Sequence, residues 1–310
     1  MARPLTGVVR AAFPAARIVA SGPAPLLELL AGDRAWDAAL PWPAAPAAVR
    51  AAAGGAIDAA LVLPPSFSSA WHAWRAGARA RIGFAADARS LLLTHAVRRP
   101  ARGDLHLGRE YLLLAGALGV DAGALGVSAL RLAGAPLPEG AGARGGFAVL
   151  APGAAYGPAK RWPLPRWIAL ARELSARGLE VLACGGAGEA EACAALVQAA
   201  GGRSLAGKTS LPQQAALCAA AAVVVSNDSG MAHLAGAVGA PTVVVFGSTS
   251  SAWTAPLGPR VQVVQHATVC SPCFRRTCAI GYECLENVRM EDVRAAVWRA
   301  LEGNPKGAIA

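Results

Sequence analysis

The chain has 310 residues, 55% of them hydrophobic and 15% charged, and its formal net charge at pH 7 is +10. This length suits two domains of ordinary size. Every window of about 18 residues, the minimum for a membrane-spanning helix, contains charge, Pro or Gly, and the N-terminus lacks the long apolar core of a signal peptide. We therefore expect a soluble, cytoplasmic protein, with an N-terminal transit peptide as the alternative.

The positive charge favours an anionic partner such as nucleic acid, a phosphorylated small molecule or a membrane surface. Arginine supplies most of it, and one group of arginines lies close together at Arg75, Arg79 and Arg81. Neither a basic run with interleaved aromatic residues nor a known nucleic-acid-binding motif is present. We therefore favour a phosphate-bearing ligand and expect no nucleic acid among the partners. An RNA-associated protein is the alternative on charge alone, and the arginine usage of a GC-rich genome explains part of the excess.

In chain order, the first half alternates apolar strands with longer helical segments, the pattern of an α/β protein with parallel sheets. The predicted elements are a helix over 4–12, a strand over 17–20, a strand over 57–63, a helix over 66–76, a strand over 81–84 and a helix over 105–118. The Gly- and Pro-rich stretch 132–146 has neither the periodicity nor the bulk to pack against a core, which predicts a linker.

The alternation starts again after this linker. Apolar strands begin at Phe147, Leu179, Ala222 and Thr242, and helices are predicted over 164–177, 189–199, 211–221, 231–238 and 290–303. The two halves have a similar design. We predict an α/β protein with two Rossmann-like domains, residues 1–140 and 141–310, facing each other across a cleft.

The first half is unusual because it starts with a helix. A doubly wound domain usually opens with a strand that becomes central in the sheet, and the turn after that strand commonly binds the ligand. Removing such a strand leaves two inner sheet edges without partners. The sequence therefore predicts a first domain that lacks its first strand, either because the start codon was assigned too late or because the chain is a truncated copy.

The most informative segment is 226–233, SNDSGMAH, which lies between two valine-rich strands. It follows a strand and opens a helix, so it lies at the carboxyl end of a sheet, where α/β folds bind ligands. Ser229 and Gly230 stand where free backbone N–H groups and the helix dipole favour a phosphate. Asp228 can accept from a sugar hydroxyl, hold a cation or cap the helix, and His233 lies one turn further on. The alternative is an N-cap and a packed histidine without a ligand.

Two further loops follow predicted strands. Loop 152–163, PGAAYGPAKRWP, carries Lys160, and a lysine in such a place is a natural partner of a diphosphate. Loop 184–191, CGGAGEAE, places Glu189 at a helix start, where its carboxylate can bind a ribose or base, or merely favour the dipole. Together the three loops predict a nucleotide-type ligand. The absence of the dinucleotide fingerprint and of the P-loop motif excludes a standard dehydrogenase or P-loop NTPase.

The seven cysteines argue against a disulfide scaffold, because their number is odd and the chain is long. Three of them fall in strand or helix patterns and read as small core residues. The other four have the spacing C-x₂-C-x₄-C-x₅-C and are Cys270, Cys273, Cys278 and Cys284. They predict either a structural zinc site or reduced thiols that pack a loop.

Four segments together resemble the ADP-heptose-dependent lipopolysaccharide heptosyltransferases of glycosyltransferase family 9, above all the heptosyltransferase II branch. In chain order these segments are LPPSFSSAWHAWRAGARARIGF at 63–84, PGAAYGPAKRWP at 152–163, SNDSGMAHLAGAVGAPTVVVFGSTS at 226–250 and CSPCFRRTCAIGYECLENV at 270–288. The resemblance implies a GT-B fold, in which residues 1–140 bind the acceptor and residues 141–310 bind the sugar nucleotide.

The resemblance also implies a reaction. It is the transfer of L-glycero-D-manno-heptose from ADP-heptose to the first heptose of the lipopolysaccharide inner core, with inversion and without a metal or other cofactor, at the cytoplasmic face of the inner membrane. The family's catalytic base resembles an aspartate in a Gly-Asp pair that would precede Met1, so no catalytic residue is predicted here. The alternative is therefore a catalytically impaired homologue that binds nucleotide sugars.

The donor-site residues that the resemblance implies are Ala155, Tyr156, Lys160, Glu189, Asp228, Ser229, Gly230 and His233. Lys160 would neutralise the diphosphate, which Ser229 and Gly230 would also bind. Asp228 and His233 would line the donor site, with Asp228 toward the heptose hydroxyls. Glu189 would face the adenosine, and the remaining two residues would contribute backbone contacts. The arginine group at 75, 79 and 81 would face the anionic acceptor or the membrane surface.

Overall fold

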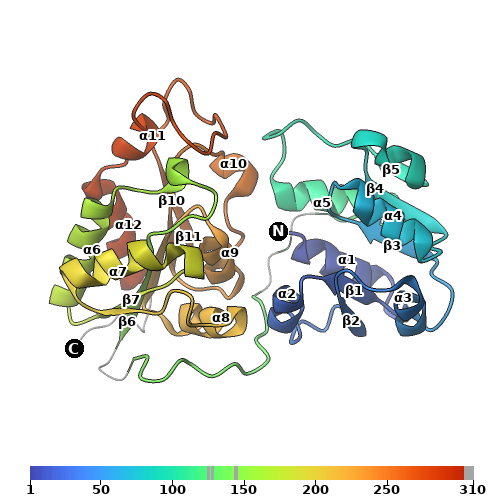
Figure 1. The fold of residues 1–310 in the computed structure, drawn as a ribbon, viewed down its shortest axis with the longest axis horizontal. Coiled ribbons are helices and arrows are strands. Elements are labelled where there is room, and N and C mark those ends of the chain that lie inside the picture. Colours follow the sequence, from blue (N-terminus) through green and yellow to red (C-terminus); the bar gives the residue numbers. More distant parts are fainter. Residues whose placement is uncertain (124–125, 127–128, 143–145, 304–310) are drawn as a thin grey trace. The chain divides into compact units, whose positions relative to one another are not determined.

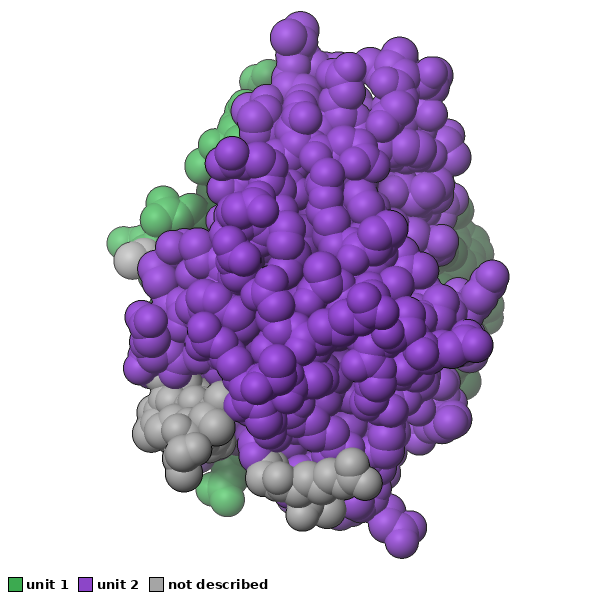
Figure 2. Space-filling model, turned by 90° about the vertical axis from the view of Figure 1, so that its left-hand side faces the viewer, with its two compact units in different colours: residues 1–127 green, residues 128–310 purple. Residues whose placement is uncertain are grey.

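A computed structural model describes residues 1–123, 126, 129–142 and 146–303, so residues 143–145 of the predicted linker 132–146 lie outside the described residues. The chain forms two compact units, unit 1 from Met1 to Val127 and unit 2 from Ser128 to Ala310, which Figure 2 distinguishes by colour. The prediction of an α/β protein with parallel sheets is confirmed, because every strand pair of the described residues is parallel. Among these residues no helix has the length and apolar character needed to span a bilayer.

Unit 1 alternates short helices with short strands (Figure 1). Its elements are α1 (Arg3–Ala12), β1 (Val19–Gly22), α2 (Ala24–Leu29), β2 (Ala38–Pro41), α3 (Pro46–Ala53), β3 (Ala59–Val62), α4 (Phe67–Arg75), β4 (Ala80–Phe84), η1 (Asp87–Leu92), β5 (His95–Val97) and α5 (Leu107–Gly116). The apolar face of α1 packs on α5, and Leu5, Ile82 and Leu114 form a core between these helices and β4. The three helices predicted for this half are confirmed to within two residues.

The strands of unit 1 form two separate sheets within the described residues. β1 pairs with β2, and β3, β4 and β5 form a second sheet in that order. The register aligns Val19 with Ala38 in the first sheet and Leu61 with Ile82 in the second. The described residues thus give this unit the alternating pattern of a Rossmann-like domain without one continuous sheet.

Unit 2 has longer and more apolar elements. They are β6 (Phe147–Ala151), η2 (Pro158–Lys160), α6 (Leu164–Ala176), β7 (Glu180–Ala183), η3 (Ala187–Glu189), α7 (Ala190–Ala200), β8 (Arg203–Ser204), α8 (Leu211–Ala220), β9 (Val223–Asn227), α9 (Gly230–Ala237), β10 (Thr242–Phe246), α10 (Ser251–Thr254), β11 (Val261–Gln265), α11 (Glu283–Glu286) and α12 (Met290–Glu302). The five predicted helices of this half are confirmed. A capping box between Ser210 and Gln213 starts α8, as its sequence favours.

The sheet of unit 2 has the order β11-β10-β9-β6-β7-β8. The chain therefore adds strands in one direction from β6 to β8, returns to the other side of β6 with β9, and continues outward. In a parallel sheet the strand order reverses at such a point, and the two neighbouring loops diverge to leave a crevice beyond the carboxyl ends of the strands. Here the crevice lies between β6 and β9.

The central strands of unit 2 lie in its hydrophobic core. Residues of β6, β9 and β10 are buried along their whole length, as expected for parallel strands that are covered on both faces. Trp162 and Trp167 pack edge to face with ring centroids 5.4 Å apart and belong to the same cluster as Val297 of α12. Helix α12 lies against β9, β10 and β11 and closes this side of the sheet.

Candidate functional site

The strand ends of unit 2 bring the predicted loops together. β6 leads into loop 152–163, β7 into loop 184–189, β9 into Asp228 and Ser229, and β10 into loop 247–250. These four strands are consecutive neighbours in the sheet, so their carboxyl ends lie along one edge. The predicted ligand-binding residues of unit 2 therefore lie at or next to this edge.

Asp228 is the centre of the site. Its Oδ2 atom lies 2.5 Å from Nζ of Lys160 and accepts a hydrogen bond of 2.6 Å from the hydroxyl of Thr249. The side chain of Asp228 is 3% exposed and that of Lys160 is 14% exposed. A carboxylate as buried as this is stable only when it is paired and hydrogen-bonded. Asp228 therefore forms an ion pair with Lys160 and does not cap the helix that follows.

Asn227 fixes the loop that carries Lys160. Its amide nitrogen donates to the carbonyl oxygens of Pro152 and Gly153 at 2.8 and 3.2 Å, and its amide oxygen accepts from the backbone N–H of Trp162 at 3.0 Å. One side chain at the end of β9 thus holds both ends of loop 152–163. This is how a residue of η2 comes to lie against Asp228.

Helix α9 begins beside the ion pair with an open N-terminus. Ser229 is its N-cap residue, but its side chain makes no capping hydrogen bond and lies 3.0 Å from the hydroxyl of Ser226. A Cβ atom added to Gly230 would meet nothing within 4 Å. There is therefore space beside Gly230, and the uncapped N-terminus of a helix suits an anion. His233, half-buried, lies on this helix next to the same edge.

Glu189 lies across the neighbouring strand-end loops. Its Oε2 atom accepts from the backbone N–H of Gly186 at 2.7 Å. A Cβ atom added to Gly153 or Gly185 would lie 2.6 or 2.7 Å from the side chain of Glu189, so a larger residue at either position would displace this carboxylate. The carboxylate is therefore held between the loops after β6 and β7.

Tyr156 supports the lysine from its own loop. The ammonium of Lys160 lies 4.7 Å from the centre of the Tyr156 ring, and the phenol hydroxyl donates to the carbonyl oxygen of Phe274. Arg276 donates to the carbonyl oxygen of Tyr156 at 2.8 Å. Ala155, the neighbouring residue, is exposed at the turn. The loop is thereby tied to the segment that follows β11, and Lys160 is positioned from two sides.

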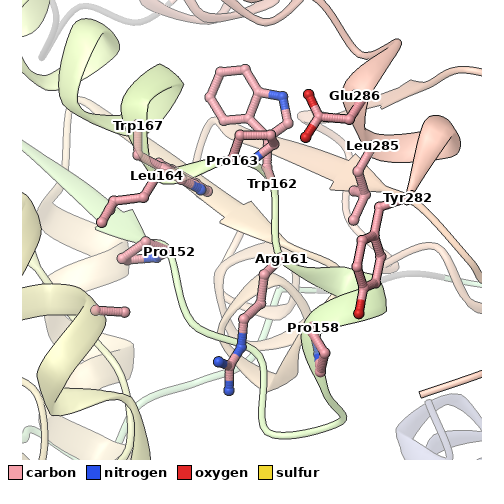
Figure 3. Close-up of a pocket in the computed structure, with 11 residues that line it drawn as sticks. Pro152, Pro158, Arg161, Trp162, Pro163, Leu164, Trp167, Tyr282, Leu285 and Glu286 are labelled. Carbon is pink, nitrogen blue, oxygen red and sulfur yellow. The ribbon is translucent and has the colours of Figure 1, made fainter. Parts of the chain in front are cut away.

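A cavity of about 330 Å³ lies beside the same loop. In Figure 3, Leu164 and Trp167 line one side and Tyr282 and Glu286 line the other. Glu286 pairs with Arg166 at 3.3 Å. The indole N–H of Trp167 is buried and has no hydrogen-bond partner among the described residues. The walls are mainly apolar, and we assign no ligand to this cavity.

The four cysteines of the C-terminal cluster differ in their surroundings, from the exposed Cys270 to the buried Cys284. Among the described residues, no group of three or more His, Cys, Asp or Glu is placed so that it could hold a metal ion. Instead, the sulfur of Cys278 accepts from the backbone N–H groups of Ile280 and Tyr282 at 3.4 Å each, and these hydrogen bonds lower the pKa of its thiol. Cys284 packs into the core of unit 2, where burial raises its pKa. Cys284 is thus part of the core, and the choice between a structural zinc site and reduced thiols stays a prediction.

The predicted arginine group belongs to unit 1, and its guanidinium groups differ in how far they are already engaged in contacts within the protein. The guanidinium of Arg81 donates to the carbonyl oxygens of Leu92 and Ala78, both at 2.6 Å. Arg79 pairs with Asp58 at 3.2 Å, and both side chains are largely exposed. Arg75 is exposed at the end of α4. Arg81 is thus engaged with the backbone, whereas Arg75 and Arg79 present their charge to solvent.

The fold and the site together define a class. Two α/β units with parallel sheets, and a polar site at the switch point of the second sheet, are the architecture of GT-B glycosyltransferases. The family model of glycosyltransferase family 9 (heptosyltransferase) matches residues 47–282. The chain belongs to this family, as the resemblance predicted.

Known proteins agree with this assignment. Lipopolysaccharide heptosyltransferase 2 of Escherichia coli strain K12 is 39% identical over 137 residues, which are 42% of this chain and 39% of that protein. The matched part thus spans well under half of that relative. The solved E. coli ADP-heptose lipopolysaccharide heptosyltransferase II superposes with a TM-score of 0.75 at 27% identity, covering 96% of this chain and 94% of that one. An E. coli heptosyltransferase solved with ADP has a TM-score of 0.72 at 20% identity, covers 96% of this chain and 95% of that one, and shows the shared fold.

Two site residues were not predicted from the sequence. Thr249 stabilises Asp228, and Asn227 fixes the lysine loop. Both follow or end a valine-rich strand, so their position at the carboxyl edge was a usable signal. Their partners are distant in sequence, and only the fold shows which groups they meet.

Proposed function

We propose that this protein transfers L-glycero-D-manno-heptose from ADP-heptose to the inner core of lipopolysaccharide. Family membership supports the reaction class, and the solved 27% identical relative is described as an ADP-heptose lipopolysaccharide heptosyltransferase. The structural observation that carries the proposal is a lysine paired with a buried aspartate at the switch point of the sheet. This pair places a cation beside the open N-terminus of a helix, where a diphosphate is best stabilised.

Lys160 and the start of α9 act on the donor diphosphate. The ammonium of Lys160 has three N–H donors, so it can stay paired with Asp228 and also donate to phosphate oxygens, and the N–H groups after Ser229 and at Gly230 donate to the same oxygens. When the glycosidic bond to the phosphate breaks, negative charge grows on the departing ADP. The same donors then stabilise the leaving group in a partly buried site, where electrostatic interactions are stronger than in water.

The remaining site residues orient the donor. Asp228, which remains paired with Lys160, accepts from heptose hydroxyls, and His233 lines the same donor site. Glu189, held between the loops after β6 and β7, accepts from the adenosine ribose. Ala155 and Tyr156 contribute backbone groups of the turn. In this proposal residues 141–310 form the donor domain.

The acceptor side completes the proposal. Residues 1–140 bind the acceptor, which is the first heptose of the inner core on Kdo2-lipid A, and the transfer inverts the anomeric configuration without a metal. Arg75 and Arg79 supply positive charge toward the anionic acceptor, and Arg81 adds to the charge of the same group. Because that acceptor is a membrane lipid, the protein works as a peripheral protein at the cytoplasmic face of the inner membrane.

The test is ADP release with purified ADP-heptose and heptosyl-Kdo2-lipid A. We expect release that requires both substrates, a product of inverted anomeric configuration by NMR, and loss of release in Lys160→Met. Isothermal titration with ADP reports donor binding separately. Binding of ADP without release in the presence of both substrates would replace the transferase by the alternative, a homologue that binds nucleotide sugars without turnover.

A further inference from the structure

Helix α4 exposes an aromatic face. Phe67, Trp71 and Trp74 stand four and three residues apart, which places them on one side of the helix, and they are 47%, 39% and 47% exposed. The opposite side of α4 is anchored, because Ala70 is fully buried against Val62 and Leu93. The helix packs on β3 and β4 (Figure 1). The exposed rings are therefore not needed to hold α4 in place.

Three of these exposed rings contact one another along α4, and a fourth lies against the same helix; we call the four the aromatic cluster: Trp42, Phe67, Trp71 and Trp74. Phe67 stacks on Trp71 with ring centroids 6.3 Å apart, and Trp71 lies 4.8 Å from Trp74. Trp42, 41% exposed, follows β2 and meets His72 of α4 edge to face at 4.4 Å. A segment distant in sequence thus adds an exposed aromatic ring beside α4, whereas surface aromatic residues normally occur singly.

The surroundings of the aromatic cluster are positively charged. Residues 38–86 contain four arginines but a single acidic residue, Asp58, which pairs with Arg79. Arg75 ends α4 directly after Trp74, and the guanidinium of Arg50 lies 3.4 Å from the carbonyl oxygens of Arg75 and Ala76. Positive charge is therefore concentrated at the C-terminal end of the helix that carries the aromatic rings.

We infer that the aromatic cluster and its arginines dock this protein on an anionic phospholipid bilayer. Tryptophan favours the boundary between acyl chains and headgroups, because its ring is apolar and its N–H group is polar. The indole N–H groups of the three tryptophans make no hydrogen bond to the described residues, so they are open to water or lipid headgroups. Arginines at the edge of the cluster complement lipid phosphates. The inference deepens the proposed peripheral location by naming its surface, but it needs no transferase activity.

Sedimentation with lipid vesicles tests this inference. The full chain is mixed with vesicles of phosphatidylcholine alone or of equal parts phosphatidylcholine and phosphatidylglycerol, without sugar nucleotide. We expect binding to the anionic vesicles and about tenfold weaker binding of Trp71→Ser/Trp74→Ser, because two interfacial rings are lost. Arg75→Glu should also weaken binding, by at least about fivefold, because one attraction becomes a repulsion. The matched control is Phe13→Ser, an aromatic side chain that is 38% exposed and outside the cluster.

The outcomes separate the possibilities. If the wild-type protein stays in solution with anionic vesicles, or if the double variant and Arg75→Glu bind like the wild type, the inference is overturned. A wild-type dimer that becomes a monomer in the double variant, without vesicle binding, would make the cluster a protein interface instead. Circular dichroism shows whether each variant is folded. If the double variant does not fold, the vesicle binding of Arg75→Glu decides the test. Because ADP titration measures the donor site independently, failure here leaves the proposed reaction untouched.

Discussion

Replacing Lys160 by methionine should destabilise unit 2 and weaken ADP binding through two separable effects. The substitution keeps the length of the side chain but removes the cation that lies 2.5 Å from Asp228, whose side chain is 3% exposed. An uncompensated carboxylate in such a place costs about 3 kcal/mol, and for a unit of this size the melting temperature should fall by about 6 to 12 °C. Arg294→Met is the control, since the Arg294–Glu173 pair is 3.6 Å long, 41% and 36% exposed, and worth less than about 1 kcal/mol.

A second substitution separates the two effects. In Lys160→Met/Asp228→Asn the buried charge is gone, while the amide keeps a hydrogen bond with Thr249, so most of the lost stability should return. ADP affinity should stay reduced by about 10- to 100-fold, because a charged hydrogen bond to phosphate is missing in both variants. Thermal unfolding and isothermal titration with ADP measure the two quantities on the same samples.

Two results would refute this reasoning. If the melting temperature of Lys160→Met equals that of Arg294→Met, Asp228 does not need Lys160 for its stability, and the buried ion pair does not exist in solution. If ADP affinity recovers together with stability in the double variant, Lys160 acts on the shape of the site and not on the diphosphate.

Three further outcomes are expected. Thr249→Val should raise the KM for the donor several-fold while Thr249→Ser stays near wild type, because valine lacks the hydroxyl that donates to Asp228 and serine keeps it. Steady-state kinetics measure this, and equal KM values for the two variants would contradict it. Iodoacetamide at neutral pH should modify Cys278 long before Cys184, because hydrogen bonds lower the pKa of the Cys278 thiol and burial raises the pKa of the Cys184 thiol to about 12. Peptide mass spectrometry gives the order of modification. If the exposed Cys270 reacts before Cys278, exposure and not the lowered pKa sets the order. The backbone N–H of Ile18, followed by Arg10, holds the pKa of Asp37 below its ordinary value, so this carboxylate stabilises the fold at neutral pH and ceases to do so as the pH falls through its folded pKa. In Asp37→Asn the free energy of unfolding should therefore depend less steeply on pH in the acid range. An acid unfolding curve by circular dichroism that matches the wild type would argue against the hydrogen bond between Asp37 and Ile18.

Much of the fold could be predicted because its strongest patterns are long. The valine runs of β9 and β10 are buried on both faces, and α6 and α12 carry regular apolar stripes, so their positions followed from periodicity. Strand β2 reads AALP and β8 is two residues long, so neither has a pattern to detect. Such short strands form because neighbouring strands pair with them. This pairing depends on distant residues, so the local sequence does not predict it.

The site was predictable as a set of loops, but not as a set of contacts. Lys160, Glu189 and Asp228 could be placed at one edge because parallel strands align their carboxyl ends. The pairing of Lys160 with Asp228 spans 68 residues, and no periodicity links them. The arginine prediction shows the same limit, since the sequence could not show that Arg81 is occupied by backbone carbonyls.

The amide of Asn227 has a mechanical consequence for recognition. Its oxygen faces a donor and its nitrogen faces two acceptors, so neither a flipped amide nor an aspartate could satisfy all three groups at once. Three hydrogen bonds consequently join the loop bearing Lys160 to the strand leading to Asp228. A ligand arriving there meets a framework that is already assembled, and little of its binding energy is consumed in ordering the chain.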